Sequence, residues 1–180
     1  ALTGGGGGSA GGGGSLKQSL SELLDAQIKM ERDSLASFNQ YMTTVTTMTD
    51  KDTSDAMNRT KAKVIDGLLN ISTMTTLSTD DQRRAWESAY DKIDASSTKF
   101  QSKMIQSLDA VAEENGVTSN AAQGAWDASV KFMSERLNGK DQDSFKSQFK
   151  AGMMSVYKQS NMSSDDIAND WKSKVDSYKG

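Results

Sequence analysis

Two pairs of adjacent carboxylates have the residue types and spacing that could do chemistry. Asp80-Asp81 follows Ser78-Thr79, and Asp165-Asp166 follows Ser163-Ser164. Paired acids can share a proton in acid-base catalysis or bind a divalent cation. Hydroxyl residues followed by acids are also typical of a helix start, where they accept amide hydrogen bonds and meet the positive end of the helix dipole. We expect these acids to begin helices, and we predict no catalytic residue.

One further segment, Asp50-Lys51-Asp52-Thr53-Ser54, begins like a calcium-binding loop. Such a loop needs a glycine at its sixth position and a glutamate at its twelfth. Asp55 and Lys61 occupy those positions here. The chain also has no histidine and no cysteine, which are the commonest ligands of transition metals. The sequence therefore predicts no metal site and no cofactor.

Charge and composition argue against two classes of function. The net charge of −3 comes from 21 basic and 24 acidic residues without a block of one sign. A nucleic-acid-binding protein needs a basic face, and here Lys61/Lys63 and Arg83/Arg84 are isolated pairs. Without histidine and cysteine, the commonest general base and thiolate nucleophile are missing. We expect neither nucleic-acid binding nor an enzyme.

The three tryptophans share one repeated frame. Trp86, Trp126 and Trp171 each follow an apolar anchor by nine residues, and the anchors are Leu77, Val117 and Met162. Apolar residues recur four and seven residues after each Trp, and six, nine and thirteen residues before each anchor. The residues thirteen, nine and six before the three anchors are, in that order, Val64, Leu68 and Ile71; Met104, Leu108 and Val111; and Phe149, Met153 and Val156. This spacing predicts two amphipathic helices in each unit.

These patterns predict an all-α fold of antiparallel helix-hairpin repeats. Three Trp-marked αα units, at approximately 61–96, 101–139 and 146–180, follow a long N-terminal helix and pack as one helical bundle or short solenoid. The absence of proline permits long helices. Residues 16–180 are expected to form one domain, and residues 1–15 a flexible Gly/Ser tether, either a linker or a natural tail.

Turn and cap residues predict where several helices begin and end. The first helix should run from Leu16 to Val45, and Thr49 or Asp50 should cap the second. Ser78 or Thr79 should cap the Trp86 helix, which should end near 95–97. Asn138-Gly139 should end the Trp126 helix, and Asp141 should cap the next. Small residues at equivalent positions suggest close helix crossings; these are Gly67, Ser107 and Gly152.

Candidate binding residues lie on the same repeated stripes. The large apolar residues are either the core of each unit or a platform for a ligand, and they are Trp86, Trp126, Trp171, Met104, Phe149 and Met153. Core packing is the better interpretation, because the stripes have helical spacing. Adjacent Met153 and Met154 cannot both face one direction. We therefore predict that Met154 contacts a partner.

The expected function is a non-enzymatic scaffold that binds a protein partner or associates with itself. The alternative is a carrier or interface-active bundle, whose Met- and Trp-lined interior opens around an apolar ligand, a lipid or a membrane surface. The chain has no N-terminal signal segment, which fits either a cytoplasmic protein or a mature chain. Its Ser/Thr-rich helices favour a secreted, extracytoplasmic mature chain.

Overall fold

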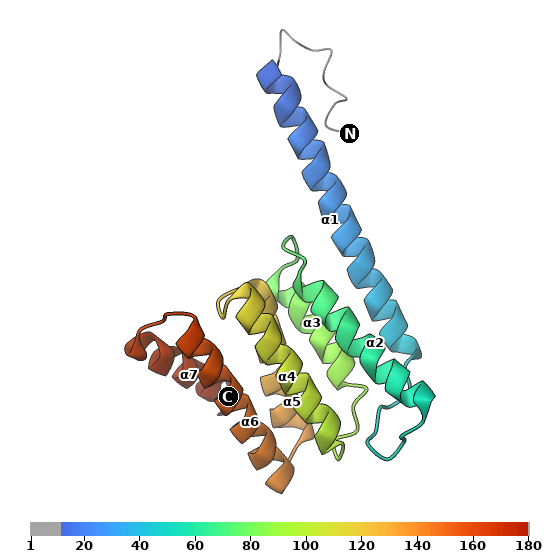
Figure 1. The fold of residues 1–180 in the computed structure, drawn as a ribbon, viewed down its shortest axis with the longest axis vertical. Helices are drawn as coiled ribbons and strands as arrows, with labels where there is room; N and C mark the ends of the chain where they lie inside the picture. The colour runs from blue at the N-terminus through green and yellow to red at the C-terminus, as the bar shows by residue number, and fades with distance from the viewer. Residues whose placement is uncertain (1–11, 180) are drawn as a thin grey trace.

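The computed structural model describes residues 12–179, which form seven α-helices and no β-strand (Figure 1). The helices are α1 (Gly12–Thr44), α2 (Asp55–Ser72), α3 (Thr79–Tyr90), α4 (Thr98–Asn115), α5 (Asn120–Arg136), α6 (Gly139–Gln159) and α7 (Ser164–Lys179). They pack into a bundle, which confirms the predicted all-α class. Residues 1–11 of the predicted tether lie outside the described residues, and its last four residues begin α1.

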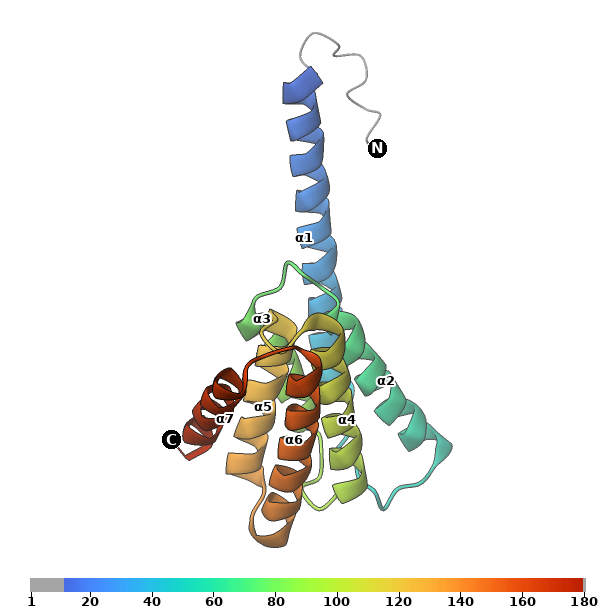
Figure 2. The ribbon, with the colours of Figure 1, turned by 60° about the vertical axis from the view of Figure 1, so that its left-hand side comes forward.

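The helices contact one another in two rows. In one row α2 packs on α4, and α4 packs on α6; in the other α3 packs on α5, and α5 packs on α7. Helix α1 contacts α2 and α3 at one end of the rows, and its N-terminal part extends away from them (Figures 1 and 2). The rows therefore form a body from which one long helix projects.

A continuous series of aromatic contacts joins four of these helices. Tyr90 of α3 stacks on Phe132 of α5 with ring centroids 4.6 Å apart. The series continues into α6 and α7 through Phe132–Phe145 at 5.8 Å, Phe145–Phe149 at 6.3 Å and Phe149–Trp171 at 6.3 Å. Aromatic pairs at such distances stabilise a core beyond the burial of their area. The core therefore extends through the body as one cluster.

The loop before α2 makes contacts that move the start of α2 and the end of α3 from their predicted places. The carboxylate of Asp50 accepts hydrogen bonds from the backbone N–H groups of Lys99 at 2.9 Å and Phe100 at 3.2 Å, so Asp50 caps α4. Helix α2 is capped by Ser54 instead. The predicted cap at Thr49 or Asp50 was therefore wrong, because a long-range contact uses the carboxylate.

A backbone bridge in the same loop explains the early end of α3. The N–H of Met48 donates to the carbonyl of Lys92 at 2.6 Å, and the N–H of Asp94 donates to the carbonyl of Met48 at 2.9 Å. The backbone at 92–94 thus pairs with another segment, and α3 ends at Tyr90 rather than near 95–97.

Helix α5 ends at Arg136, close to the predicted stop at Asn138-Gly139.

The start of α6 also differs from prediction. Helix α6 begins at Gly139 with Asn138 as its N-cap residue, whereas Asp141 was predicted to be the cap. Gly139 has a φ of +57°, a conformation that glycine adopts without steric cost. The chain therefore turns directly from one helix into the next, and Asp141 lies within the first turn of α6.

Glycines mark close helix contacts, as predicted for two of them. A Cβ atom on Gly67 would lie 2.7 Å from the ring of Phe38 in α1, and one on Gly152 would collide with the carboxylate of Asp109 in α4. The closest backbone approach occurs at Gly124, which was not predicted. A Cβ atom there would lie 2.6 Å from the backbone of α3, at Arg83 N and Thr79 O.

Candidate functional site

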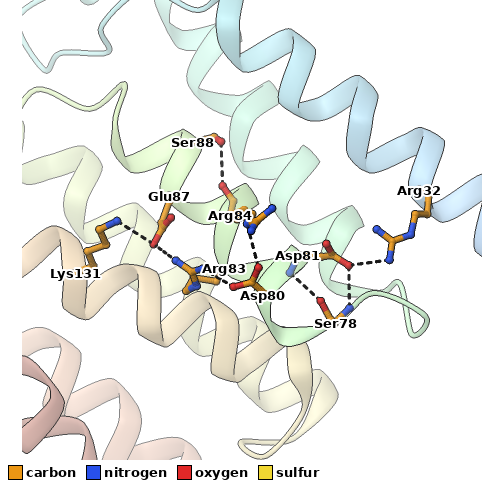
Figure 3. A network of polar contacts seen from close by, with 9 residues as sticks. All are labelled: Arg32, Ser78, Asp80, Asp81, Arg83, Arg84, Glu87, Ser88 and Lys131. Atoms are coloured by element: carbon orange, nitrogen blue, oxygen red, sulfur yellow. Dashed lines mark hydrogen bonds and ion pairs between the residues drawn. The ribbon is translucent and has the colours of Figure 1, made fainter.

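The adjacent acids at the start of α3 lie in a network of ion pairs and hydrogen bonds (Figure 3). Ser78 Oγ accepts from the N–H of Asp81 at 3.1 Å, and the N–H of Ser78 donates to the Asp81 carboxylate at 3.2 Å. This reciprocal capping box is the helix start that the sequence predicts. Arg32 of α1 lies 3.4 Å from the same carboxylate. Asp81 therefore has a structural role at the α3 N-terminus.

Asp80 is held as an anion by two arginines of its own helix. It forms ion pairs with Arg83 and, at 3.0 Å, with Arg84. The hydrogen bond from Arg83 is the main reason that the pKa of Asp80 lies below its ordinary value. Arg83 also pairs with Glu87 at 2.7 Å, and Glu87 lies 3.5 Å from Lys131 of α5. The network in Figure 3 links α1, α3 and α5 through neutralised charges.

The other predicted helix start follows the same pattern. Ser163 Oγ accepts from the N–H of Asp166 at 3.1 Å, and both Asp165 and Asp166 are exposed. Within the residues that the structure describes, no group of three acidic residues is arranged to hold a metal ion. The acids at both places are thus explained by helix capping.

The candidate platform residues lie in the interior of the body. Trp86 and Trp126 are both 0% exposed, whereas Trp171 is partly buried. Met104, Phe149 and Met153 are buried as well. Trp126 packs edge-on against Tyr157 at 5.8 Å, and the amine of buried Lys174 lies 5.4 Å from its ring centroid. Among the described residues, neither Trp86 nor Trp126 finds an acceptor for its indole N–H.

Met154, the predicted partner contact, is partly buried at the edge of the core on α6, beside fully buried Met153. The two side chains therefore lie in different environments. That difference follows from their adjacent positions on a helix.

One titratable group was missed by the sequence analysis. Asp109 of α4 lies against Gly152 of α6, and burial raises its pKa to about 7, with a smaller contribution from the charge of Glu113. Its Oδ1 atom has no hydrogen-bond partner in the described part of the chain. A signal was available in the sequence, since the equivalent positions of the other units hold apolar residues, Leu69 and Met154.

The largest exposed apolar side chains lie on the projecting part of α1. Leu16, Leu20 and Leu24 are 57%, 54% and 52% exposed, and Leu23 and Ile28 are 40% and 37% exposed. We call these five residues the α1 stripe. Their spacing of three and four residues places them on one side of the helix. Soluble monomers rarely leave such a contiguous apolar patch uncovered, so the α1 stripe is the candidate site.

The α1 stripe continues the buried face of the same helix. Farther along α1 and just past its end, the side chains that face the body are Leu35, Phe38, Met42 and Val45, each at most 8% exposed. The exposed and buried parts are joined by steps of four, three and four residues, from Leu24 to Ile28, to Glu31 and to Leu35. Glu31 is buried. One apolar face therefore runs along the helix and is covered by the body over its C-terminal half.

A buried carboxylate fixes the point at which α1 leaves the body. Glu31 accepts hydrogen bonds from the backbone N–H and the hydroxyl of Thr76, both at 2.9 Å, and from Gln27 at 2.9 Å. Gln27 in turn lies 3.5 Å from the Thr75 hydroxyl. These bonds hold α1 on the loop between α2 and α3 (Figures 1 and 2). The leucines of the α1 stripe lie N-terminal to this clamp, and Ile28 lies between Gln27 and Glu31.

The sequence predicts these leucines within a long helix, but their spacing alone does not show that they lack a partner. The signal was the length of the helix. Helix α1 has 33 residues, whereas the other helices have 12 to 21. At 1.5 Å per residue it is about 50 Å long, and helices of the body cover only part of that length.

Comparison with known proteins gives no relative for this chain. No family model matches it, and neither does any curated protein or solved structure. Within residues 12–179, no helix has both the length and the apolarity needed to cross a bilayer. The geometry of the α1 stripe and the body is therefore the basis for assigning a function.

Proposed function

We propose that this chain is a non-enzymatic scaffold, in which a stack of helix-hairpin repeats holds α1 in place and presents the α1 stripe to a protein partner. The observation that carries the proposal is the contrast between the two parts. The interior of the body is closed, with Trp86 and Trp126 both 0% exposed, whereas Leu16 and Leu20 on α1 are more than half exposed. An apolar face on a rigid helix is a common means of protein recognition.

Burial at equivalent positions supports the repeat in this proposal. The residues thirteen, nine and six before the three anchors are each at most 2% exposed: Val64, Leu68, Ile71, Met104, Leu108, Val111, Phe149, Met153 and Val156. The two rows of contacts, α2–α4–α6 and α3–α5–α7, are those expected when one helix pair stacks on the next.

The repeat also gives Met154 a place in the proposed scaffold. Met154 and Asp109 occupy equivalent positions, eight residues before their anchors. Asp109 contacts Gly152 of the following unit, whereas Met154 belongs to the last unit. We propose that Met154, partly buried at this end of the stack, is a secondary contact for a partner.

The carrier alternative has less support. The residues that would line a ligand cavity pack on one another, as Trp126 does on Tyr157 and Phe149 does on Trp171. A helix that binds an anionic membrane surface is usually flanked by basic residues. The α1 stripe is flanked by a balanced set of charges, Lys17, Glu22, Asp25 and Lys29, in a chain of net charge −3. These features favour a protein partner.

Native mass spectrometry of the purified chain tests the scaffold proposal. We expect the bare chain mass or an integer multiple of it, because a packed body has no internal ligand. A non-protein adduct that is lost on denaturation would contradict the proposal and favour the carrier. Its identity could then be read from the mass difference.

A further inference from the structure

We propose that the α1 stripe binds the α1 stripe of a second copy of this chain, so that two projecting helices pair antiparallel about Leu20. This inference rests on the scaffold function and names its partner. Leu20 lies midway between Gly12, where α1 begins, and Ile28, the last residue of the α1 stripe.

The direction of pairing follows from the continuity of the apolar face. The body packs on the same face of α1 that carries the α1 stripe, one half-helix farther along. In a parallel pair the two bodies would lie at the same end of the paired helices. Each body would occupy the side of α1 on which the other copy lies, so the two bodies would overlap. In an antiparallel pair the bodies lie at opposite ends. The projecting geometry in Figures 1 and 2 leaves space for that arrangement.

The length available for pairing matches the projecting segment. The α2–α3 loop reaches α1 at Gln27 and Glu31, so a second helix has room from Gly12 to about Ala26. An antiparallel helix centred on Leu20 fills this interval, with Gly14 of one copy opposite Ala26 of the other. The first residues of each helix thus lie where the loop of the other copy begins.

Three leucines of the α1 stripe are self-complementary. Leu16, Leu20 and Leu24 follow one another in equal steps of four residues. Reversal about Leu20 places Leu16 opposite Leu24 and Leu20 opposite itself, whereas Ile28 lies opposite Gly12 and outside this set. A two-fold interface requires this property, because the same patch must fit its own copy.

Area and charge both permit the pairing. Two such stripes would bury on the order of 1,000 Å² in total, which is near the lower limit for a specific interface. The expected dimer is therefore weak, with a dissociation constant on the order of micromolar. Within the paired segment of each copy, Lys17 offsets one of the two acids Glu22 and Asp25, so the net charge is −1 and the repulsion between copies is small.

Sedimentation equilibrium of the full chain, from about 1 to 200 μM, tests whether the pair forms. We expect a monomer–dimer equilibrium that the double variant Leu20→Gln/Leu24→Gln weakens at least tenfold. Glutamine keeps the helix propensity while removing the apolar side chain. The matched control is Ser21→Gln/Ala26→Gln, at two uncharged positions outside the α1 stripe, which should dimerise like the parent. A monomer throughout, or equal loss in both variants, would overturn the proposal.

Disulfide cross-linking tests the direction, and the cysteine-free sequence makes single introduced thiols specific reporters. A mixture of Leu16→Cys and Leu24→Cys chains should form the mixed disulfide under mild oxidation. Leu16→Cys alone should cross-link poorly, because its two copies lie about eight residues apart along the pair, beyond the reach of a disulfide. Efficient Leu16–Leu16 cross-linking would overturn the antiparallel arrangement.

Two other occupants are outcomes of these tests. If the chain stays monomeric and floats with vesicles of phosphatidylcholine and phosphatidylserine unless Leu20 and Leu24 are replaced, the occupant is a membrane surface. If it stays monomeric and does not float, the occupant is a different protein. Either result overturns self-pairing. The scaffold proposal fails separately, through a non-protein adduct in the native mass spectrum.

Discussion

The carboxylate of Glu31 in α1 accepts two hydrogen bonds from Thr76 in the α2–α3 loop, one from the backbone N–H and one from the hydroxyl, both at 2.9 Å. The side chain is 4% exposed. Burial raises the pKa of this carboxyl, but the hydrogen bonds from Thr76 and Gln27 outweigh that effect and hold the pKa below its ordinary value. The anion thus orients the projecting half of α1.

Removal of this contact should weaken the fold in a pH-dependent way. Glu31→Ala and Thr76→Val should couple by about 1–2 kcal/mol in a double-mutant cycle, since one charged hydrogen bond is lost in both. The folded-state pKa is depressed, so the stabilisation is present above the unfolded value, about 4.5, and is lost as the pH falls through the folded value. Urea unfolding at pH 7 and pH 3 measures both effects. An equal coupling at the two pH values would contradict the role of the anion.

Asp109 should make stability fall as the pH rises. Its folded-state pKa of about 7 is above the ordinary 3.8, so between these values the folded chain keeps a proton that the unfolded chain has lost. Above pH 7 the half-buried carboxylate destabilises the fold. Asp109→Asn should therefore stabilise at pH 8 by on the order of 1–3 kcal/mol and have little effect near pH 4.

Thermal or urea unfolding across pH 4–8 measures the difference between Asp109→Asn and the parent. The control is Asp143→Asn, an exposed acid on α6. If the free energy of unfolding of both variants changes with pH as that of the parent does, the carboxyl of Asp109 is not the titrating group.

Gly124 should be the least replaceable glycine in the bundle. Alanine favours a helix by about 1 kcal/mol over glycine, but here its Cβ would meet the α3 backbone at 2.6 Å. We expect Gly124→Ala to destabilise by about 1–3 kcal/mol, because overpacking forces two helices apart. Gly67→Ala is the comparison, since its Cβ meets the ring of Phe38, a side chain that can move. Urea denaturation should rank Gly124→Ala as the more harmful change.

Lys174 should control both the docking of α7 and the titration of Asp127. Its amine donates to the side-chain Oε1 of Gln123 at 2.5 Å and lies 3.8 Å from the Asp127 carboxylate. Burial raises the pKa of Asp127, and the charge of Lys174 opposes that rise. In Lys174→Met the pKa of Asp127 should increase, as carboxyl NMR titration would show, and the amides of α7 should exchange faster. Lys172→Met, at an exposed position of the same helix, should change neither.

The sequence predicted what depends on local pattern. Helical spacing placed Val64, Met104 and Phe149 on stripes, and all three are buried. A cap at Ser78 or Thr79 was predicted from residues within one helical turn, and the structure has Ser78 as the cap with a capping box to Asp81. Such features follow from the period of the helix and from the chemistry of its first turn.

Features that depend on distant segments were missed. Asp50 caps α4 across nearly fifty residues, so its own position gave no sign that α2 would begin at Ser54. The tight contact at Gly124 depends on which helices cross there. The exposure of Leu20 depends on where the body ends, because an uncovered leucine has the same spacing as a covered one. Tertiary placement decides each of these, and local pattern does not encode it.

The backbone bridge between Met48 and the segment after α3 has a consequence for the order of folding. A helical bundle built from neighbouring contacts can begin to fold at many places and folds quickly for that reason. The two hydrogen bonds at Met48 close a loop that contains both α2 and α3. Loop closure costs conformational entropy that only the packed pair repays. Helices α2 and α3 should therefore form together, as one cooperative step, before α1 is held in its projecting position.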